Sequence, residues 1–176
     1  MSGTTVLDGI CRYFGGPYDP KTHTYRASPV PGVGIVRRAW PKDDGHQDFF
    51  HGMPPGARTG SMLVFWIPRR SEGRFAVAGP YNGQKNVLYQ IEGACYLRSR
   101  TPDAEDAQDD MYALQDALVE WMRRDRTLGK ACFQAGEHVE GGSGTIDFDN
   151  GQPETKGQLT KSFFLMSFTA LEIAQA

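Results

Sequence analysis

The chain has 176 residues, a length that favours one domain spanning residues 1–176. Hydrophobic residues make up 39% of it and the formal net charge is only −2, which excludes wholesale disorder. The sequence contains no run of about 18 apolar residues and no secretion signal pattern at its start, so we expect a soluble protein that is not exported by this route. A sequence pI of about 6.1 argues against a general nucleic-acid-binding protein.

The first element predicted is a short amphipathic helix. It begins after Thr4 or Thr5, has apolar residues at helical spacing, and ends at the Gly-Gly-Pro that follows. Four prolines in residues 15–32 indicate an extended loop, because proline fixes φ and lacks a backbone donor. Residues 33–40 favour a strand. Residues 41–60, rich in proline and glycine, are predicted to form a second long loop.

The middle of the chain is dominated by strand patterns. Residues 61–68 form a continuous apolar run, which is typical of a buried strand. The polar stretch 69–73 ends in glycine, so residues 61–80 are predicted to form a β-hairpin with a short charged turn. Residues 87–98 alternate apolar and polar positions, which indicates a further strand.

One long helix follows these strands. Thr101 is the expected N-cap, Pro102 takes the first helical position, and acidic residues lie near the positive end of the helix dipole. Gly129 is the expected stop. An apolar stripe is formed at helical spacing by Met111, Leu114, Leu118, Trp121 and Met122. Most acidic residues of the helix fall away from this stripe, so we expect them on a side that faces solvent or a partner.

The C-terminal part predicts further strands around a glycine-rich segment. Residues 131–134 favour a short strand, and residues 136–157 a flexible loop or protruding hairpin around Ile146 and Phe148. Residues 159–173 predict a long closing strand that is apolar on much of both faces. The element order favours an α+β fold: a mixed, largely antiparallel sheet covered by one main helix and a short N-terminal helix, with long Pro/Gly-rich loops.

Charge is unevenly distributed along the chain. Thirteen of the 19 Lys and Arg residues precede Thr101, whereas fourteen of the 21 Asp and Glu residues follow Arg100. The two halves could neutralise each other within one fold. Alternatively, an acidic surface of one copy could meet a basic surface of the next, as in a head-to-tail ring.

Three motifs that resemble reactive sites are interpreted as structural. The HxDxxH pattern of His46, Asp48 and His51 lies in a loop with no rigid support and no fourth ligand, so we predict neither a metal site nor catalysis. Residues 79–85, GPYNGQK, lack the adjacent Gly-Lys of a phosphate-binding loop and predict a turn. Residues 141–145, GGSGT, are interpreted as a flexible linker rather than a nucleophile elbow.

The remaining candidate residues concern packing and contacts. Cys11, Cys95 and Cys132 are an odd number without CxxC spacing and are predicted to be reduced core thiols. Trp40 follows a strand beside a Pro-rich loop, where an aromatic side chain can anchor an interface. The other candidate interface residues are Glu137, Glu140, Ile146, Asp147, Phe148 and Asp149. No catalytic residue, metal or cofactor is predicted.

Two stretches carry a resemblance to a known family. The phrases MYALQDALVEWMRRDRTLGKACFQAGE and TKSFFLMSFTALEI, separated by a Gly-rich acidic insertion, resemble tail terminator proteins of long-tailed, siphovirus-type bacteriophages. The resemblance covers roughly residues 60–173 in element order and includes no catalytic motif. The Pro-rich loops at residues 15–32 and 41–60 have no counterpart in it.

The resemblance implies a structural virion protein that is not an enzyme. Such proteins form a hexameric ring that caps the tail tube, ends tail polymerisation and joins the tail to the head connector. The implied partners are further copies of the chain, the major tail tube protein, the head-tail connector protein and genomic DNA passing through the lumen without sequence-specific binding. The implied location is the virion tail or neck, and the host cytoplasm during assembly.

Two alternatives to a tail terminator remain open from the sequence. One is another phage neck or tail-completion protein, which would share the charge distribution and the lack of a catalytic motif. The other, from a different class, is a small-ligand-binding domain or enzyme that uses the loop from His46 to His51.

Overall fold

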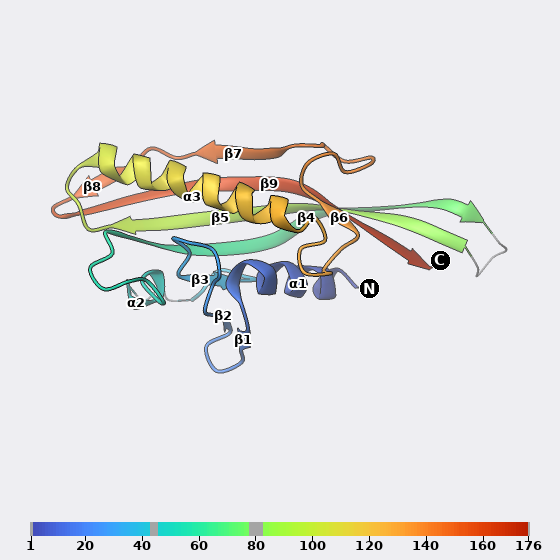
Figure 1. The fold of residues 1–176 in the computed structure, drawn as a ribbon, viewed down its shortest axis with the longest axis horizontal. Helices are drawn as coiled ribbons and strands as arrows, with labels where there is room; N and C mark the ends of the chain where they lie inside the picture. Colours follow the sequence, from blue (N-terminus) through green and yellow to red (C-terminus); the bar gives the residue numbers. More distant parts are fainter. Residues whose placement is uncertain (1, 43–45, 78–82, 176) are drawn as a thin grey trace.

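A computed structural model describes residues 2–42, 46–77 and 83–175 (Figure 1). It confirms the predicted α+β class, with a mixed sheet, one main helix and a short N-terminal helix. The elements in chain order are α1 (Gly3–Gly15), β1 (Tyr18–Asp19), β2 (Thr24–Tyr25), β3 (Ile35–Arg37), α2 (His46–Phe49), β4 (Thr59–Val77), β5 (Gly83–Ser99), α3 (Ala104–Arg124), β6 (Gln134–Ala135), β7 (Ile146–Asn150), β8 (Glu154–Lys156) and β9 (Leu159–Gln175).

The sheet is built around three long strands. Its order is β1-β2-β3-β4-β5-β9-β6, and β7 and β8 also pair with β9. All these pairings are antiparallel except that of β3 with β4. β4, β5 and β9 run well past the helices at one end of the molecule (Figure 1). The alternating pattern of β5 explains its place: Tyr89, Ile91 and Cys95 are buried on one face while Gln90 is exposed.

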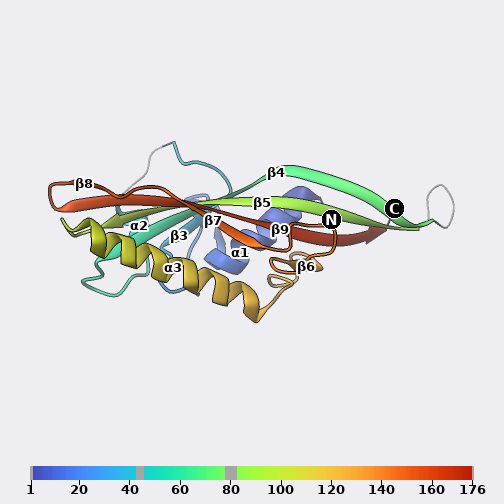
Figure 2. The ribbon, with the colours of Figure 1, turned by 90° about the horizontal axis from the view of Figure 1, so that it is seen from above.

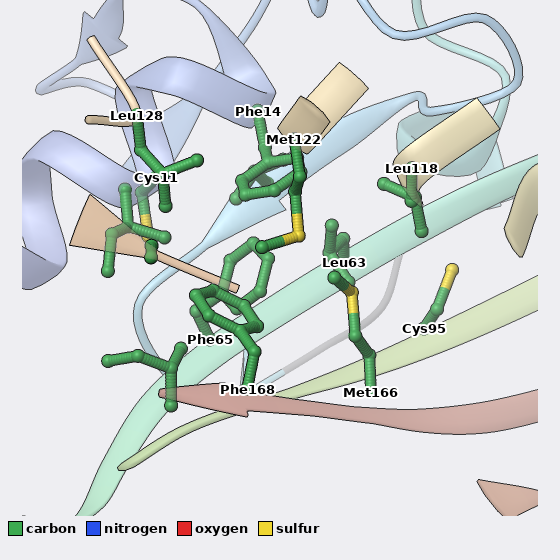
Figure 3. Close-up of a cluster of buried hydrophobic side chains, with 14 of the residues drawn as sticks. Cys11, Phe14, Leu63, Phe65, Cys95, Leu118, Met122, Leu128, Met166 and Phe168 are labelled. Atoms are coloured by element: carbon green, nitrogen blue, oxygen red, sulfur yellow. The ribbon is translucent and has the colours of Figure 1, made fainter. Parts of the chain in front are cut away.

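Both main helices pack on one side of the sheet (Figure 2). Ser2 caps α1, because its side chain accepts a hydrogen bond from the backbone N–H of Thr5; the helix therefore begins slightly earlier than predicted. The core between helices and sheet is shown in Figure 3. Phe14 from α1 and Phe168 from β9 contact Phe65 of β4, with ring centroids 5.1 and 6.4 Å away.

The start of α3 is tied to the sheet by polar contacts. Its N-cap is Asp103 rather than the predicted Thr101. Thr101 is instead buried: its hydroxyl accepts from the backbone N–H of Asp103, and its carbonyl accepts from the hydroxyl of Thr160 in β9. Arg58 forms ion pairs with Asp106 and Asp110 of the helix. These contacts hold the first turns of α3 over the ends of β4, β5 and β9.

The predicted hairpin within residues 61–80 is wrong. Residues 69–73 do not turn; they continue β4 and pair with residues 86–90 of β5. The polar composition that suggested a turn has another cause, since this part of β4 lies beyond the helices and is exposed along residues 68–74. Residues 78–82, which join β4 to β5, lie outside the described residues.

Several segments predicted as loops or longer strands contain short paired elements. β1 and β2 form within residues 15–32, and the four-residue helix α2 forms within residues 41–60. The strand predicted at 33–40 is reduced to β3, and that at 131–134 is displaced to β6. Within residues 136–157, β7 and β8 pair with β9, so much of this segment belongs to the sheet instead of standing away from it.

Candidate interaction surfaces

The sheet has one face that the main helices leave uncovered. Side chains alternate across each strand, so the residues opposite the core face outward on β4, β5, β9 and β7. At one end, α2 packs against this second face: Phe49 joins a small buried cluster with Ile35, Met62 and Val64. Beyond that cluster the outward side chains of β5, β9 and β7 form a surface that we call the open face.

Aromatic side chains gather at the end of the open face near α2. Trp40 packs edge-on against Tyr96 of β5, with ring centroids 4.7 Å apart. Tyr96 stacks on Phe163 of β9, its registered neighbour, at 5.9 Å. Trp40 is 55%, Phe163 41% and Leu165 38% exposed. We call Trp40, Tyr96, Phe163 and Leu165 the aromatic patch; contiguous exposed apolar groups of this kind are typical of interaction sites.

Two hollows border the aromatic patch. One, of about 280 Å³, lies beside Phe163 and is lined by Arg98 and Lys161 as well as Phe49. The other, of about 190 Å³, lies between Trp40, Lys42 and Tyr96. Both hollows combine aromatic and basic lining side chains, which suits them to side chains of a partner.

Charge changes sign along the open face. Arg98 and Lys161 are direct cross-strand neighbours on β5 and β9, which makes one end basic. The Arg98 guanidinium also lies 4.1 Å from the ring centroid of Phe49. Further along β9, Leu165 and Ser167 pair with two residues of β7, Asp149 and Asp147 respectively. The open face therefore has Arg98 and Lys161 beside Glu154 near one end, and Asp147 and Asp149 further along, where Arg69 of β4 lines the same hollow as Asp147.

The outer side of α3 forms a second surface, on the opposite side of the molecule. Glu105, Asp109, Tyr112, Asp116 and Glu120 recur at helical spacing and are exposed. We call these five residues the acidic stripe. Tyr112 is 43% exposed, and its hydroxyl accepts a hydrogen bond from the Gln108 amide. Within the described part of the chain, Glu105, Asp109 and Asp116 form no ion pair.

The acidic residues on the inner side of α3 differ from those of the stripe. Asp110 accepts hydrogen bonds from Arg58 and from the Thr59 hydroxyl. Partial burial raises the pKa of Asp110, but these two donors outweigh it and hold that pKa below its usual value. Asp110 thus anchors the helix, whereas Glu105, Asp109 and Asp116 of the stripe are exposed and Glu120 pairs with Arg124 on the same helix.

The candidate interface residues from the sequence divide between two faces. Trp40, Asp147 and Asp149 lie on the open face. Ile146 and Phe148 point the other way and are partly buried against the main core, where Phe148 meets Phe164 edge-on at 5.7 Å. They therefore stabilise β7 within the subunit. Glu137 forms an ion pair with Arg123 of α3, and Glu140 is exposed beside the glycine-rich loop.

The alternation of Ile146 and Phe148 with aspartates was the available signal for β7, and it went unused because the surrounding glycines indicated a loop. The aromatic patch was only partly foreseen. Strand alternation puts Phe163 and Leu165 on one face of the closing strand predicted over residues 159–173, but nothing local in the sequence brings them beside Tyr96 and Trp40.

The HxDxxH loop is occupied by structural ion pairs. Asp48 lies between Arg26 and Arg37, with N–O distances of 3.4 and 3.2 Å. The His46 side chain lies outside the described residues, and His51 is half-buried. Among the residues that the structure describes, no group of three His, Cys, Asp or Glu side chains could hold a metal ion.

The other motifs also have structural roles. Cys11, Cys95 and Cys132 are buried and unpaired, as predicted, and burial raises the pKa of the Cys132 thiol to about 12, which disfavours the reactive thiolate. The 141–145 loop packs against β9, where the backbone N–H of Ser143 donates to the hydroxyl of Thr169. Of residues 79–85, only the last three are described, and they begin β5.

No protein-family model matches the chain, and no curated protein matches it. Among the described helices, none is long and apolar enough to cross a membrane.

Proposed function

We propose that this chain is a structural virion protein of a long-tailed bacteriophage, a tail terminator that forms a hexameric ring. The ring would cap the tail tube, end its polymerisation and join the tail to the head connector. One observation carries the proposal beyond the resemblance in the sequence: the subunit presents the aromatic patch and the acidic stripe on opposite sides. Two different, opposite-facing surfaces suit repeated head-to-tail contacts, which close into a ring when the rotation allows.

The proposed partners follow from this role. Copies of the chain contact each other around the ring, the major tail tube protein lies on one side of it, and the head-tail connector protein on the other. Genomic DNA passes through the lumen without sequence-specific contacts. The protein acts without catalysis or a cofactor, in the host cytoplasm during assembly and then in the virion tail or neck.

The location of the protein in a virion tests the proposal directly. Immunogold labelling of phage particles should place it at the junction between tail tube and head, and electron microscopy of the purified protein should show closed rings. Label elsewhere in the neck would favour a different neck or tail-completion protein. Absence from virions, or a purified protein that binds a small ligand stoichiometrically, would contradict the proposal.

A further inference from the structure

We propose that the sheet edge formed by β7 of one subunit pairs, antiparallel, with the free edge of β4 of the next subunit. This inference rests on the proposed ring and names a contact that joins its subunits. The occupant of each edge is a second copy of the chain, because the two edges lie on opposite sides of one sheet and are complementary in charge and in length.

Both strands have an edge without a neighbouring strand in the described part of the chain. β3 pairs with β4 only over residues 62–64, and beyond them β4 pairs only with β5. β7 pairs only with β9. The backbone N–H and C=O groups on these two outer edges are therefore available to another strand. The outer part of β4 projects past the helices, whereas β7 borders the part of the sheet that α3 covers (Figure 1).

The available segment of β4 has defined ends. Its pairing with β5 is irregular before Arg69 and after Arg74, and Pro68, which lacks a backbone N–H, lies at the first irregularity. Residues 69–74 lie between these points, pair regularly with β5 and are exposed. β7 is five residues long, so the two edges match in length.

The two edges carry opposite charges on the same face of the sheet. Arg69 of β4 and Asp149 and Asp147 of β7 are exposed, and none of the three forms an ion pair in the described part of the chain. The ion pair between Arg70 and Glu72 lies on the other face of β4. Two β4 edges or two β7 edges would bring like charges together, which is unfavourable, whereas β4 against β7 places arginine beside aspartate. Unlike edges therefore pair, as in a head-to-tail ring.

One register satisfies both the charges and the faces of the two strands. Residues that pair across adjacent strands have their side chains on the same face of the sheet. Arg69 and Ser71 line one hollow together with Asp147, so these side chains share a face. With Asp149 opposite Arg69 of the neighbour, Asp147 falls opposite Ser71. Asp147 is then also diagonal to Arg69, a position that a long side chain can reach.

This register also fixes how far each subunit shifts along the strands. Within a subunit, the row of Asp149 leads through Leu165 to Ala94 of β5. The row of Arg69 passes instead through Gln90 of β5. Each contact therefore shifts the next subunit by the length of β5 from Ala94 to Gln90, about 14 Å, across a sheet width from β4 to the next β4 of about 19 Å. The corresponding strand tilt is about 36°, within the range of about 35–45° at which a sheet can close on itself.

Charge reversal on the two edges tests the contact. Arg69→Glu and Asp149→Arg should each weaken self-association about tenfold, and the double variant should recover most of the loss, as measured by sedimentation velocity and native mass spectrometry. Both side chains are exposed, so the single variants should unfold like wild type. Lys21→Glu is the matched control and should not weaken association, because Lys21 is an exposed residue between β1 and β2, away from both edges.

Strand pairing has two further signatures that a general charge contact lacks. Ser71→Cys and Asp147→Cys place cysteines at exposed positions that are opposite each other in this register, whereas the native cysteines are buried. When the two single variants are mixed with oxidised glutathione, a disulfide should link one to the other, and such a link can only join different subunits. In wild type, the backbone amides of residues 69–74 and 146–150 should gain protection from hydrogen exchange on assembly.

The outcomes separate the inference from the proposed function. Oligomers that gain no protection at either edge and yield no linked subunits would overturn the edge pairing while leaving a ring possible through other surfaces. A wild-type chain that stays monomeric at high concentration would also overturn the pairing, and labelling of virions would still decide the protein's location. A double variant that associates no better than either single variant would overturn the register, because Arg69 and Asp149 would then not be in contact.

Discussion

A buried polar pair illustrates how single residues link neighbouring strands of the sheet in the core. Tyr89 of β5 is fully buried, and its hydroxyl donates to Oε2 of Glu172 on β9 at 2.8 Å; Glu172 is itself only 3% exposed. Desolvation of the phenol, and next the hydrogen bond to Glu172, raise the pKa of Tyr89 to about 12 from a usual value of 10.0.

The raised pKa predicts a loss of stability in alkali. Between pH 10 and about 12 the unfolded chain ionises this tyrosine while the folded chain retains the proton, so the free energy of unfolding falls as pH rises. Tyr89→Phe should be less stable than wild type at pH 8 and should lose part of the alkaline decline, about 2 kcal/mol at most. Urea unfolding followed by circular dichroism from pH 8 to 11.5 measures the stability at pH 8 and its decline in alkali. Equal declines in the free energy of unfolding of wild type and Tyr89→Phe would contradict this role of Tyr89.

The loop histidines are predicted to have little energetic importance. The double variant His46→Ala, His51→Ala should unfold within about 0.5 kcal/mol of wild type, as expected for polar residues that hold no metal. Asp48→Ala is the control in the same loop and should cost more, about 1 kcal/mol, because Arg26 and Arg37 lose their shared carboxylate. Elemental analysis of purified wild-type protein should find no stoichiometric zinc or iron; either metal at full occupancy would contradict the interpretation.

At the scale of elements, hydrophobic periodicity correctly predicted most of the segments that pack in the core between the helices and the sheet. The stripe of α3 and the alternation of β5 were correctly assigned, because burial on one side imposes a clear period on the sequence. The full length of β4 was missed, since residues 69–73 are exposed beyond the helices and their polar character matches a turn equally well. Residues 146–150 were predicted only as part of a flexible loop or protruding hairpin, because their pairing with β9 is a long-range contact that the sequence does not indicate.

Glycine 93 gives a stringent test of how β4 and β5 pack under the helices. A Cβ at Gly93 would lie 2.6 Å from the ring of Phe65, which is fully buried. Gly93→Ala should therefore lower the free energy of unfolding by about 1 to 3 kcal/mol, as overpacked cores do. Gly73→Ala in β4 is the matched control, because nothing lies within 4 Å of its added Cβ. Thermal and urea unfolding measure the stability of the two variants against wild type. A Gly93→Ala variant as stable as wild type would show that Phe65 can move aside.

At the scale of the whole molecule, the sequence indicated the charge imbalance but not the surfaces that carry it. Trp40 was a candidate contact from its local setting, whereas its neighbours Tyr96 and Phe163 come from two other strands. Most acidic residues of α3 were expected on a side that faces solvent or a partner, which the exposure of Glu105, Asp109 and Asp116 supports. The placement of the acidic stripe and the aromatic patch on opposite sides depends on how α3 packs against the sheet, and periodicity alone cannot provide that placement.

Ring assembly should depend on salt without being abolished by it. Glu105, Asp109 and Asp116 of the acidic stripe are exposed. The Debye length falls from about 8 Å at physiological ionic strength to about 3 Å at 1 M, so raising the salt concentration should weaken any association that uses these charges. A contact between subunits through the aromatic patch would be apolar and should persist. Phe163→Ser should therefore weaken association at both low and high salt, whereas wild type weakens only as salt rises. Sedimentation velocity over a NaCl series at fixed protein concentration measures both effects. Wild-type association that is equal at the two extremes would remove the electrostatic contribution, while the aromatic contact would still be tested by the serine variant.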